Sequence, residues 1–370
     1  KPRLPDAPAG YCILRCDGLE GIDIKSLTPA QREEALAEFR LPAYRVKQIA
    51  GWLDSGADSF AAMTSLPSAL REELAKKFVI PGVKIEKKLV SGVDNTVKYL
   101  YGLSDGEAVE SVLMEYHHGW SQCLSTQVGC RMGCAFCATG MGGLSRNLLP
   151  SEMLAQIEAA QADRGIRVSS VVLMGMGEPL DNFDNVMRFL EMLSSPGGVQ
   201  IGMRHVSLST CGVVDKIYEL MKYDWQLTLS ISLHAPNNAL RDRLMPINHK
   251  WPVETLLAAC RDYLAATGRR ISFEYAMMDG INDTDACAHE LADKLKGMLC
   301  HVNLIPANDV AGKAHHRSSR RRLEAFRGIL EKRGLNVTVR RTLGADINAS
   351  CGQLRRQEHN GKSPGSGGSS

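Results

Sequence analysis

The chain has 370 residues, of which 44% are hydrophobic and 23% are charged, and its formal net charge is +3. This length allows a large core in one big domain or two smaller ones, while the small net charge identifies no partner. No apolar run approaches the ~20 residues of a membrane span, and the first residues lack the apolar core of a signal peptide. Eleven cysteines are too few for a disulfide scaffold in a chain this long. We therefore expect a cytoplasmic protein without a membrane partner.

Residues 1–82 predict a small helical accessory domain. Thr28 before Pro29 is a typical helix start, because a hydroxyl N-cap precedes a proline at the first helical position. Two further helical patterns cover residues 44–53 and 67–78. Residues 83–120 then alternate between apolar and polar positions in three runs, which predicts a short antiparallel β extension that also links to the next domain.

Strand-like and helix-like segments alternate through residues 121–357, which predicts parallel strands with helical crossovers. The strands are expected at residues 123–127, 168–173, 205–209, 227–233, 271–275, 301–305 and 337–340. The helices are expected at residues 151–162, 182–193, 213–221, 253–266, 283–295 and 317–333. A complete eight-fold barrel needs more units, so we predict an α/β fold with a partial, open (β/α)6 barrel. The Gly- and Ser-rich residues 358–370 predict a flexible tail.

Three cysteines share one short loop after the first expected strand of this domain. Cys130, Cys134 and Cys137 have the spacing C-x3-C-x2-C, and three such thiolates can hold three irons of a [4Fe-4S] cluster. The fourth iron is then open to a substrate. A structural zinc site is the alternative, but zinc usually takes four ligands and the chain has no second C-x2-C pair.

The cysteine loop resembles the signature of the radical S-adenosylmethionine (SAM) enzymes, in which the open iron binds SAM. Gly175-Met176-Gly177-Glu178-Pro179 follows an apolar strand and resembles the G-E-P motif that contacts the SAM amino group in these enzymes. The resemblance implies that Gly177 and Glu178 bind SAM. It also implies that the ribose and carboxylate of SAM contact Ser209, Ser232, Leu233, His234 and Asn308. A hydrogen-bonded structural histidine explains His234 equally well.

Over residues 95–355 the chain resembles the RlmN/Cfr family of radical SAM RNA methyltransferases. The matching motifs include S-T-Q-V-G-C-R-M-G-C-A-F-C-A-T-G, G-M-G-E-P-L-D-N, S-L-H-A, V-N-L-I-P-A-N and D-I-N-A-S-C-G-Q-L. The segment R-L-M-P-I-N-H-K-W-P and the N-terminal unit look more like RlmN, which methylates adenine C2. Methylation of C8, the Cfr-type resistance activity, is the alternative. An iron–sulfur electron carrier and a zinc-stabilised RNA-binding module are less favoured, because neither explains the remaining cysteines.

The resemblance also implies roles for residues outside the cysteine loop. Cys351, in a polar segment near the end of the chain, would take a methyl group from one SAM as a thiolate. A second SAM would supply the radical that lets this methyl carbon add to adenine. Cys123, expected near the start of the first barrel strand, would remove a proton from the adduct and form a transient disulfide with Cys351. Glu110 matches the acidic residue assigned as proton acceptor, although an exposed strand carboxylate explains it without the family.

RNA binding is also indicated by charge. Between residues 313 and 341 the basic side chains greatly outnumber the acidic ones, and such a patch can bind phosphates. The basic residues are Lys313, Arg317, Arg320, Arg321, Arg322, Arg327, Lys332, Arg333, Arg340 and Arg341. The N-terminal domain is also expected to bind RNA. The expected partners are 23S rRNA, tRNA as a second substrate, and an electron donor such as flavodoxin or ferredoxin, acting on a monomer.

Overall fold

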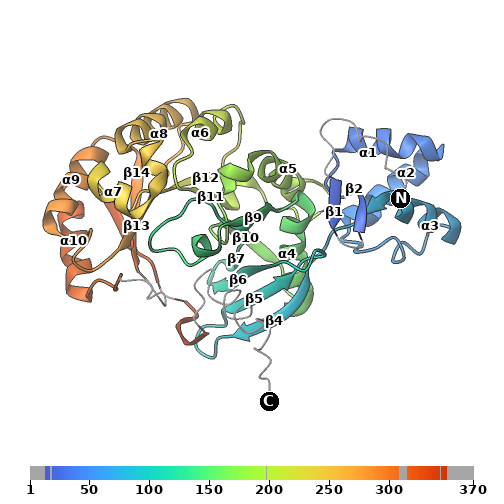
Figure 1. The fold of residues 1–370 in the computed structure, drawn as a ribbon, viewed down its shortest axis with the longest axis horizontal. Helices are drawn as coiled ribbons and strands as arrows, with labels where there is room; N and C mark the ends of the chain where they lie inside the picture. The colour runs from blue at the N-terminus through green and yellow to red at the C-terminus, as the bar shows by residue number, and fades with distance from the viewer. Residues whose placement is uncertain (1–12, 17–18, 197, 308–314, 342, 348–370) are drawn as a thin grey trace, which may run out of the picture.

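A computed structural model describes residues 13–16, 19–196, 198–307, 315–341 and 343–347. It shows an N-terminal unit beside a larger α/β body (Figure 1). The unit consists of β1 (Ile13–Cys16), β2 (Leu19–Asp23), α1 (Pro29–Leu36), α2 (Ala43–Asp54), α3 (Ser68–Lys77) and β3 (Phe78–Val79). All three expected helices are present. The three short strands were not predicted, and they form a separate sheet in the order β1-β2-β3.

The N-terminal unit has a core of its own. Ile24, Leu27, Leu53 and Phe78 are among its buried side chains, which form a cluster separate from that of the barrel. Thr28 caps α1 as expected, because its hydroxyl accepts a hydrogen bond from the amide of Gln31 and the Gln31 side chain accepts from the amide of Thr28. This reciprocal capping box satisfies two donors at the helix start.

One ten-stranded sheet runs through the rest of the molecule in the order β15-β14-β13-β12-β11-β10-β7-β6-β5-β4. Its first four strands along the chain are antiparallel, and β7 and the six strands that follow in the sheet are parallel. The strands are β4 (Lys84–Val90), β5 (Val97–Gly102), β6 (Ala108–Tyr116), β7 (Gly119–Cys123), β10 (Val168–Leu173), β11 (Val206–Thr210), β12 (Thr228–Ser232), β13 (Ile271–Met277), β14 (Cys300–Pro306) and β15 (Asn336–Val339). The predicted antiparallel extension is therefore continuous with the barrel sheet.

Helices cover the outer face of the parallel strands and complete six strand–helix units (Figure 1). They are α4 (Pro150–Arg164), α5 (Phe183–Ser194), α6 (Val214–Leu220), α7 (Asn238–Leu244), α8 (Val253–Thr267), α9 (Asp285–Leu295) and α10 (Arg320–Lys332). Short 3-10 segments are η1 (Ala37–Phe39), η2 (Thr139–Gly142), η3 (Pro179–Asn182), η4 (Met203–His205), η5 (Pro246–His249) and η6 (Ala345–Ile347). The partial (β/α)6 barrel is confirmed, with β15 as a seventh parallel strand. Among the described residues, none of the helices is both long and apolar enough to cross a bilayer.

The first barrel strand lies four residues earlier than expected. Strand β7 ends at Cys123, and the segment predicted as strand instead contains the start of β8 (Gln127–Gly129), which pairs with β9 (Leu144–Asn147) as a separate hairpin. Cys123 thus lies at the end of its strand and not near its start. Carboxyl ends of parallel strands are where α/β barrels place their reactive groups.

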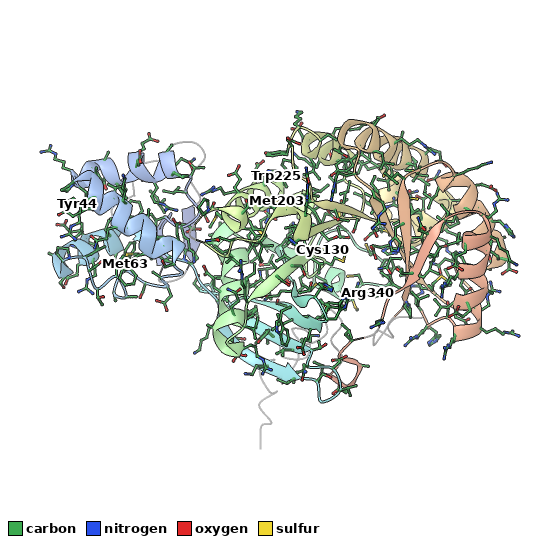
Figure 2. All side chains as sticks on the ribbon, turned by 180° about the vertical axis from the view of Figure 1, so that it is seen from behind. Tyr44, Met63, Cys130, Met203, Trp225 and Arg340 are labelled. Atoms are coloured by element: carbon green, nitrogen blue, oxygen red, sulfur yellow. The ribbon has the colours of Figure 1, made fainter. Side chains whose placement is uncertain are left out.

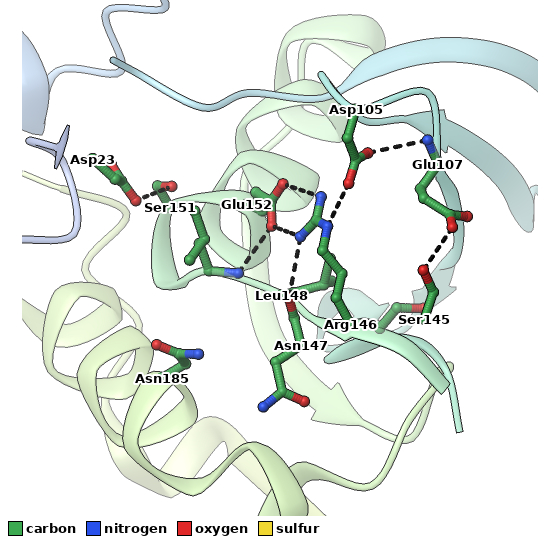
Figure 3. A network of polar contacts seen from close by, with 12 residues as sticks. Asp23, Asp105, Glu107, Ser145, Arg146, Asn147, Leu148, Ser151, Glu152 and Asn185 are labelled. Carbon is green, nitrogen blue, oxygen red and sulfur yellow. Dashed lines mark hydrogen bonds and ion pairs between the residues drawn. The ribbon is translucent and has the colours of Figure 1, made fainter. Parts of the chain in front are cut away.

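A buried polar network joins the N-terminal unit to the barrel (Figure 3). Asp23 of β2 accepts a hydrogen bond of 2.7 Å from the hydroxyl of Ser151 at the start of α4, and Lys25 donates to Glu158 of the same helix. Farther along, Arg146 of β9 pairs with Glu152 of α4 and with Asp105. One continuous set of contacts therefore links the N-terminal unit, α4 and the hairpin that carries the cysteine loop.

Candidate active site

The β8–β9 hairpin presents the cysteine loop. Cys130 follows β8 directly, and its amide donates to the carbonyl of Gly143 at 2.8 Å, which closes the loop. Gly129 makes this closure possible: its φ is +81°, and a Cβ atom there would lie 2.0 Å from the carbonyl oxygen of Gly143. A left-handed φ and so close an approach both require glycine. The loop also bonds to the barrel, since Ala135 donates to the carbonyl of Leu244.

The three loop thiols line one cavity without converging on a single metal position. In the described part of the chain, no three Cys, His, Asp or Glu side chains converge as ligands of one metal ion. Burial raises the pKa of Cys130 to about 12 and that of Cys134 well above its usual value. Thiols in such a setting become thiolates when a metal binds them. A [4Fe-4S] cluster suits separated thiols, because each cysteine binds a different iron.

Glu178 connects the ends of two neighbouring strands. It follows β10, its side chain is buried, and its two carboxylate oxygens accept from the amides of Leu180 and Cys211 at 3.0 and 2.7 Å. Burial raises the pKa of this carboxyl, while the hydrogen bonds from Cys211, Thr210 and Leu180 oppose that rise. Gly177 has a φ of +105°. A Cβ atom added at this position would lie 2.6 Å from the Gln127 side chain, so any side chain there would clash with β8.

The structure brings some of the residues after β11 and β12 that were expected to contact SAM close to one another. The hydroxyls of Ser209 and Ser232 lie 3.4 Å apart across the two strands. His234 is buried, its Nδ1 accepts from the amide of Ala276 at 2.9 Å, and its ring meets Phe136 of the cysteine loop edge-on. Burial, and then the charge of Arg241, lower the pKa of His234 to about 3, so the ring is neutral. Leu233 points into the apolar core, so only its backbone faces the polar groups around it.

Arg241 of α7 organises these strand ends and was missed in the sequence. Its guanidinium is fully buried and donates to the backbone carbonyls of Cys211, Ser232 and Leu233, and to the side chain of Asn248. One side chain therefore fixes the two loops that follow β11 and β12. The only sequence signal was an arginine on a short helix directly after S-L-H-A, and a surface role would explain that arginine equally well.

A cavity of about 290 Å³ opens over the cysteine loop. All three loop cysteines line it, together with Gly177, Glu178, Ser209, Ser232 and His234. Glu274 of β13, whose carboxylate is held by Ser272 and Asn303, also lines the cavity and was not predicted, whereas Arg340 after β15 was predicted only as part of a basic RNA-binding patch. Cys130 follows β8 and Arg340 follows β15, in separate parts of the fold (Figure 2), and both line this cavity. Five of the seven predicted cofactor contacts thus share one cavity with the predicted metal ligands.

Cys123 of β7 and Glu110 of β6 lie on the inner face of the barrel. In antiparallel strands, directly paired residues point to the same face. Cys123 of β7 pairs with Val112 of β6, and Glu110 is two positions along, so both share this face as diagonal neighbours. Both are buried. Glu110 is no exposed strand carboxylate: it forms an ion pair with Lys98 of β5, in which the two charged atoms are 3.0 Å apart.

The segment that leads toward Cys351 approaches the same inner face. Leu343 packs against the cluster formed by Cys123, Val112 and Met114. Beyond it, Asp346 accepts hydrogen bonds from the hydroxyl of Ser91 and the amide of Gly92, and Gly344 donates to Asp94. The turn between β4 and β5 thus fastens this segment at both of its ends. Asn308, Lys313 and Cys351 lie outside the described residues.

Comparison with known proteins agrees with this architecture. The Radical SAM superfamily profile matches residues 124–291. A probable dual-specificity RNA methyltransferase RlmN from Alkaliphilus oremlandii is 49% identical, covering 92% of this chain and 99% of the relative. Its counterpart from Pelotomaculum thermopropionicum is 52% identical over 91% of this chain and 92% of its own length.

The chain belongs to the RlmN family of radical SAM RNA methyltransferases. The crystal structure of a radical SAM methyltransferase from Sphaerobacter thermophilus superposes with a TM-score of 0.84 at 44% identity, covering 89% of this chain and 98% of that one. Membership of the family implies SAM and a [4Fe-4S] cluster as cofactors, and the donor set beneath the cavity fits such a cluster. The predicted family is thereby confirmed.

Proposed function

We propose that this enzyme methylates carbon C2 of an adenosine in the peptidyl transferase region of 23S rRNA, and of an anticodon-adjacent adenosine in tRNA. The names of the relatives support two RNA substrates, since they are dual-specificity RNA methyltransferases. Adenine C2 lies between two ring nitrogens and is electron-poor, so direct attack on the SAM methyl group is unfavourable. When bound, the cluster and two SAM molecules supply the methyl group and the radical that this carbon requires.

The single observation that best supports this reaction is the position of Cys123. It lies at a strand end on the inner face, next to Glu110, and it is not among the residues that line the cavity with the three loop cysteines. The segment leading to Cys351 packs against it through Leu343. Close approach of the two sulfurs is what a transient disulfide requires.

Each residue then has a defined role. Cys130, Cys134 and Cys137 would hold the cluster, while Glu178, Ser209, Ser232 and His234, the backbone of Gly177 and Leu233, and Asn308 would position SAM. Cys351 would carry the methyl group, and Cys123 would release the product by taking a proton and attacking the Cys351 sulfur. Glu110 would be the final proton acceptor. A monomer in the cytoplasm, reduced by a flavodoxin or ferredoxin, completes the proposal.

The rim of the cavity offers a place for RNA phosphates. In strand–helix units, each helix begins near the edge of the sheet at which the preceding strand ends. Arg320 and Arg321 at the start of α10 therefore lie at the same edge as the cavity. Both side chains are exposed. Arg322 differs from them, since it bonds to the Asp283 carbonyl and to Asp285 within the protein. The target adenosine would have to be unpaired or flipped out to enter the cavity.

Mass spectrometry of modified nucleosides tests the proposal directly. The reconstituted holoenzyme is incubated with SAM, a chemical reductant and either 23S rRNA or tRNA, and the RNA is then digested. We expect 2-methyladenosine from both RNAs. The appearance of 8-methyladenosine instead would contradict the proposed carbon, and modification of rRNA alone would contradict the second substrate.

A further inference from the structure

The ion pair between Lys98 and Glu110 is unusual in its setting. Both side chains are 1% exposed, and the charged atoms are 3.0 Å apart. They lie on the inner face of β5 and β6, among apolar neighbours such as Leu100, Ala108 and Val112. On the outer face of the same strands, Tyr99, Tyr101, Val109 and Leu113 pack in the main core. The charged pair is therefore confined to the face that carries Cys123.

Stability alone gives a poor explanation of this pair. Desolvating two charges costs several kcal/mol per ion, and well-packed apolar residues in place of a buried pair are often as stable or more so. Removal of one partner is far worse, because it leaves an uncompensated buried charge. A charged pair retained on the inner face of a barrel, beside a buried cysteine, is the arrangement expected where a carboxylate must stay ionised in an apolar setting.

We propose that Lys98 is a positioning residue that holds the Glu110 carboxylate beside Cys123, so that Glu110 can take the proton that Cys123 must give up before it attacks the Cys351 sulfur. This inference rests on the proposed function, because it assigns a partner to the acceptor named there. Lys98 contacts neither the RNA nor SAM in this proposal, and it acts through the carboxylate alone.

Resolution of the RNA adduct requires a group that accepts a proton from Cys123, and this is the role of the Glu110 carboxylate. Radical addition leaves the adduct with one unpaired electron, which the [4Fe-4S] cluster, when bound, would take up as a one-electron acceptor. When the RNA adduct is then resolved, the C2–H bond breaks and its proton goes to the Cys123 thiolate. The resulting thiol must lose that proton before its electron pair can form the S–S bond, and Glu110 accepts it. As the S–S bond forms, the S–C bond breaks and its electron pair goes to carbon, which takes up a proton to become the methyl group. The two sulfurs lose two electrons and the carbon gains them; a dithiol reductant later restores the thiols.

Among the described residues, the strands around Glu110 place the following charged or titratable groups near it. From β4, Lys87 pairs in register with Leu100, which in turn pairs with Glu110, so Lys87 shares the inner face one strand farther away. Cys123 is the neighbour from β7, and the end of β10 contributes the uncharged Met176, whose sulfur accepts from the Glu110 amide. Lys98 is a cation in direct contact with the carboxylate, so its removal should change the response of the carboxylate to pH.

The test uses Lys98→Met in the full-length holoenzyme, with Lys88→Met as the matched control. Lys88 lies on the outer face of the neighbouring strand and pairs with Asp163 at the surface. For each variant, RNA-linked protein is quantified on denaturing gels after nuclease treatment, between pH 6.5 and 9.5. We expect Lys98→Met to accumulate the adduct at neutral pH, slow its resolution at least tenfold, and move the pH profile upward by about one unit or more. Lys98→Arg should restore the wild-type profile, and Lys88→Met should match wild type.

A second variant covers the case in which Lys98→Met does not fold. Lys98→Met/Glu110→Leu replaces the pair by apolar groups of similar size, and it should fold, bind iron and methylate Cys351, yet accumulate the adduct. Normal resolution by either variant, with an unchanged pH profile, would overturn the role of Lys98. Failure of the proposed function looks different, because the wild-type enzyme would then show neither Cys351 methylation nor any RNA adduct.

Discussion

The carboxylate of Glu178 accepts a hydrogen bond of 2.7 Å from the amide of Cys211, which connects the loop after β10 to the loop after β11. The other carboxylate oxygen accepts from Leu180. Because both loops contribute residues to the lining of the cavity, this one side chain holds two neighbouring parts of its wall together. The same carboxylate is the proposed contact of the SAM amino group.

Replacement of Glu178 by glutamine should weaken SAM binding. The amide group has one acceptor oxygen instead of two, so one backbone donor is left unsatisfied, at a cost of about 1–3 kcal/mol. We expect at least a tenfold loss of SAM affinity with iron content retained, measured by equilibrium dialysis and iron analysis. Glu191→Gln is the control, because Glu191 pairs only with Arg188 on the surface of α5. Wild-type affinity in Glu178→Gln would show that the walls are held by other contacts.

Closure of the cysteine loop depends on Gly129. Alanine there would place its Cβ 2.0 Å from the Gly143 carbonyl and at φ of +81°, so the hairpin would have to open. Gly129→Ala should therefore lose most of its iron after anaerobic reconstitution, as measured by iron and sulfide analysis. Gly142→Ala is a control in the same loop, where an added Cβ meets no atom within 4 Å. Equal iron in both variants would contradict this account of the loop.

The interface between the N-terminal unit and the barrel should respond to pH through Asp23. Burial is the largest influence on this carboxyl and raises its pKa from 3.8 to about 6, although hydrogen bonds from Ser26 and Ser151 oppose the rise. The folded state therefore binds the proton more tightly. The resulting stabilisation is complete below pH 3.8 and is lost as the pH rises through 6. Between pH 5 and pH 8 the loss amounts to about 1.4 kcal/mol.

Thermal unfolding of wild type and Asp23→Asn at pH 5 and pH 8 measures this effect. The wild-type enzyme should lose about 1.4 kcal/mol more than the variant over this interval. Asp58→Asn, on the exposed surface of the same unit, should follow wild type. An Asp23→Asn variant with the full wild-type pH dependence would assign that dependence to another group.

If RNA phosphates bind at the cavity rim, removal of basic side chains at the rim should affect RNA binding, whereas removal of basic side chains at the far ends of the helices should not. Arg320→Ala/Arg321→Ala should weaken RNA binding, and should reduce the slope of log affinity against log salt by up to about 2, because each phosphate contact contributes about 0.9. Lys296→Ala/Lys332→Ala removes the same charge from the far ends of α9 and α10 and should leave the slope unchanged. Equal effects of the two pairs would indicate diffuse electrostatic attraction rather than a binding rim.

The sequence predicted those features of the fold that depend on local pattern. Alternating strands and helices gave the barrel, and Thr28 with Pro29 marked the start of α1. The strands of the N-terminal unit were missed because they have two to five residues and form only through pairing across the unit. The end of β7 was misplaced because the apolar residues after Cys123 continue a strand pattern, although the chain leaves the sheet there to form the β8–β9 hairpin.

In the candidate site, too, residues in local motifs could be predicted, whereas residues that meet only in the folded chain could not. The loop cysteines, Gly177 and Glu178 occur in motifs and were predicted from them, but Arg241, Glu274 and Arg340 reach the cavity region through tertiary packing. The ion pair of Lys98 with Glu110 depends on the register between β5 and β6, in which Glu110 directly opposes Leu100. Spacing along the chain does not encode that register, so the carboxylate was expected to be exposed if it had no catalytic role.

The division of labour between Cys123 and Cys351 is the central claim. Cys351→Ala has no sulfur to methylate, so it should form neither methylated protein nor an RNA adduct. Cys123→Ala can still be methylated and add to the base, but it lacks the thiol that breaks the bond between Cys351 and carbon.

The most direct measurement is a denaturing gel of each alanine variant after reaction with RNA and digestion with nuclease. The account predicts a shifted, RNA-linked protein band in Cys123→Ala and none in Cys351→Ala. Normal turnover by Cys123→Ala, or equal trapping of RNA by both variants, would contradict it.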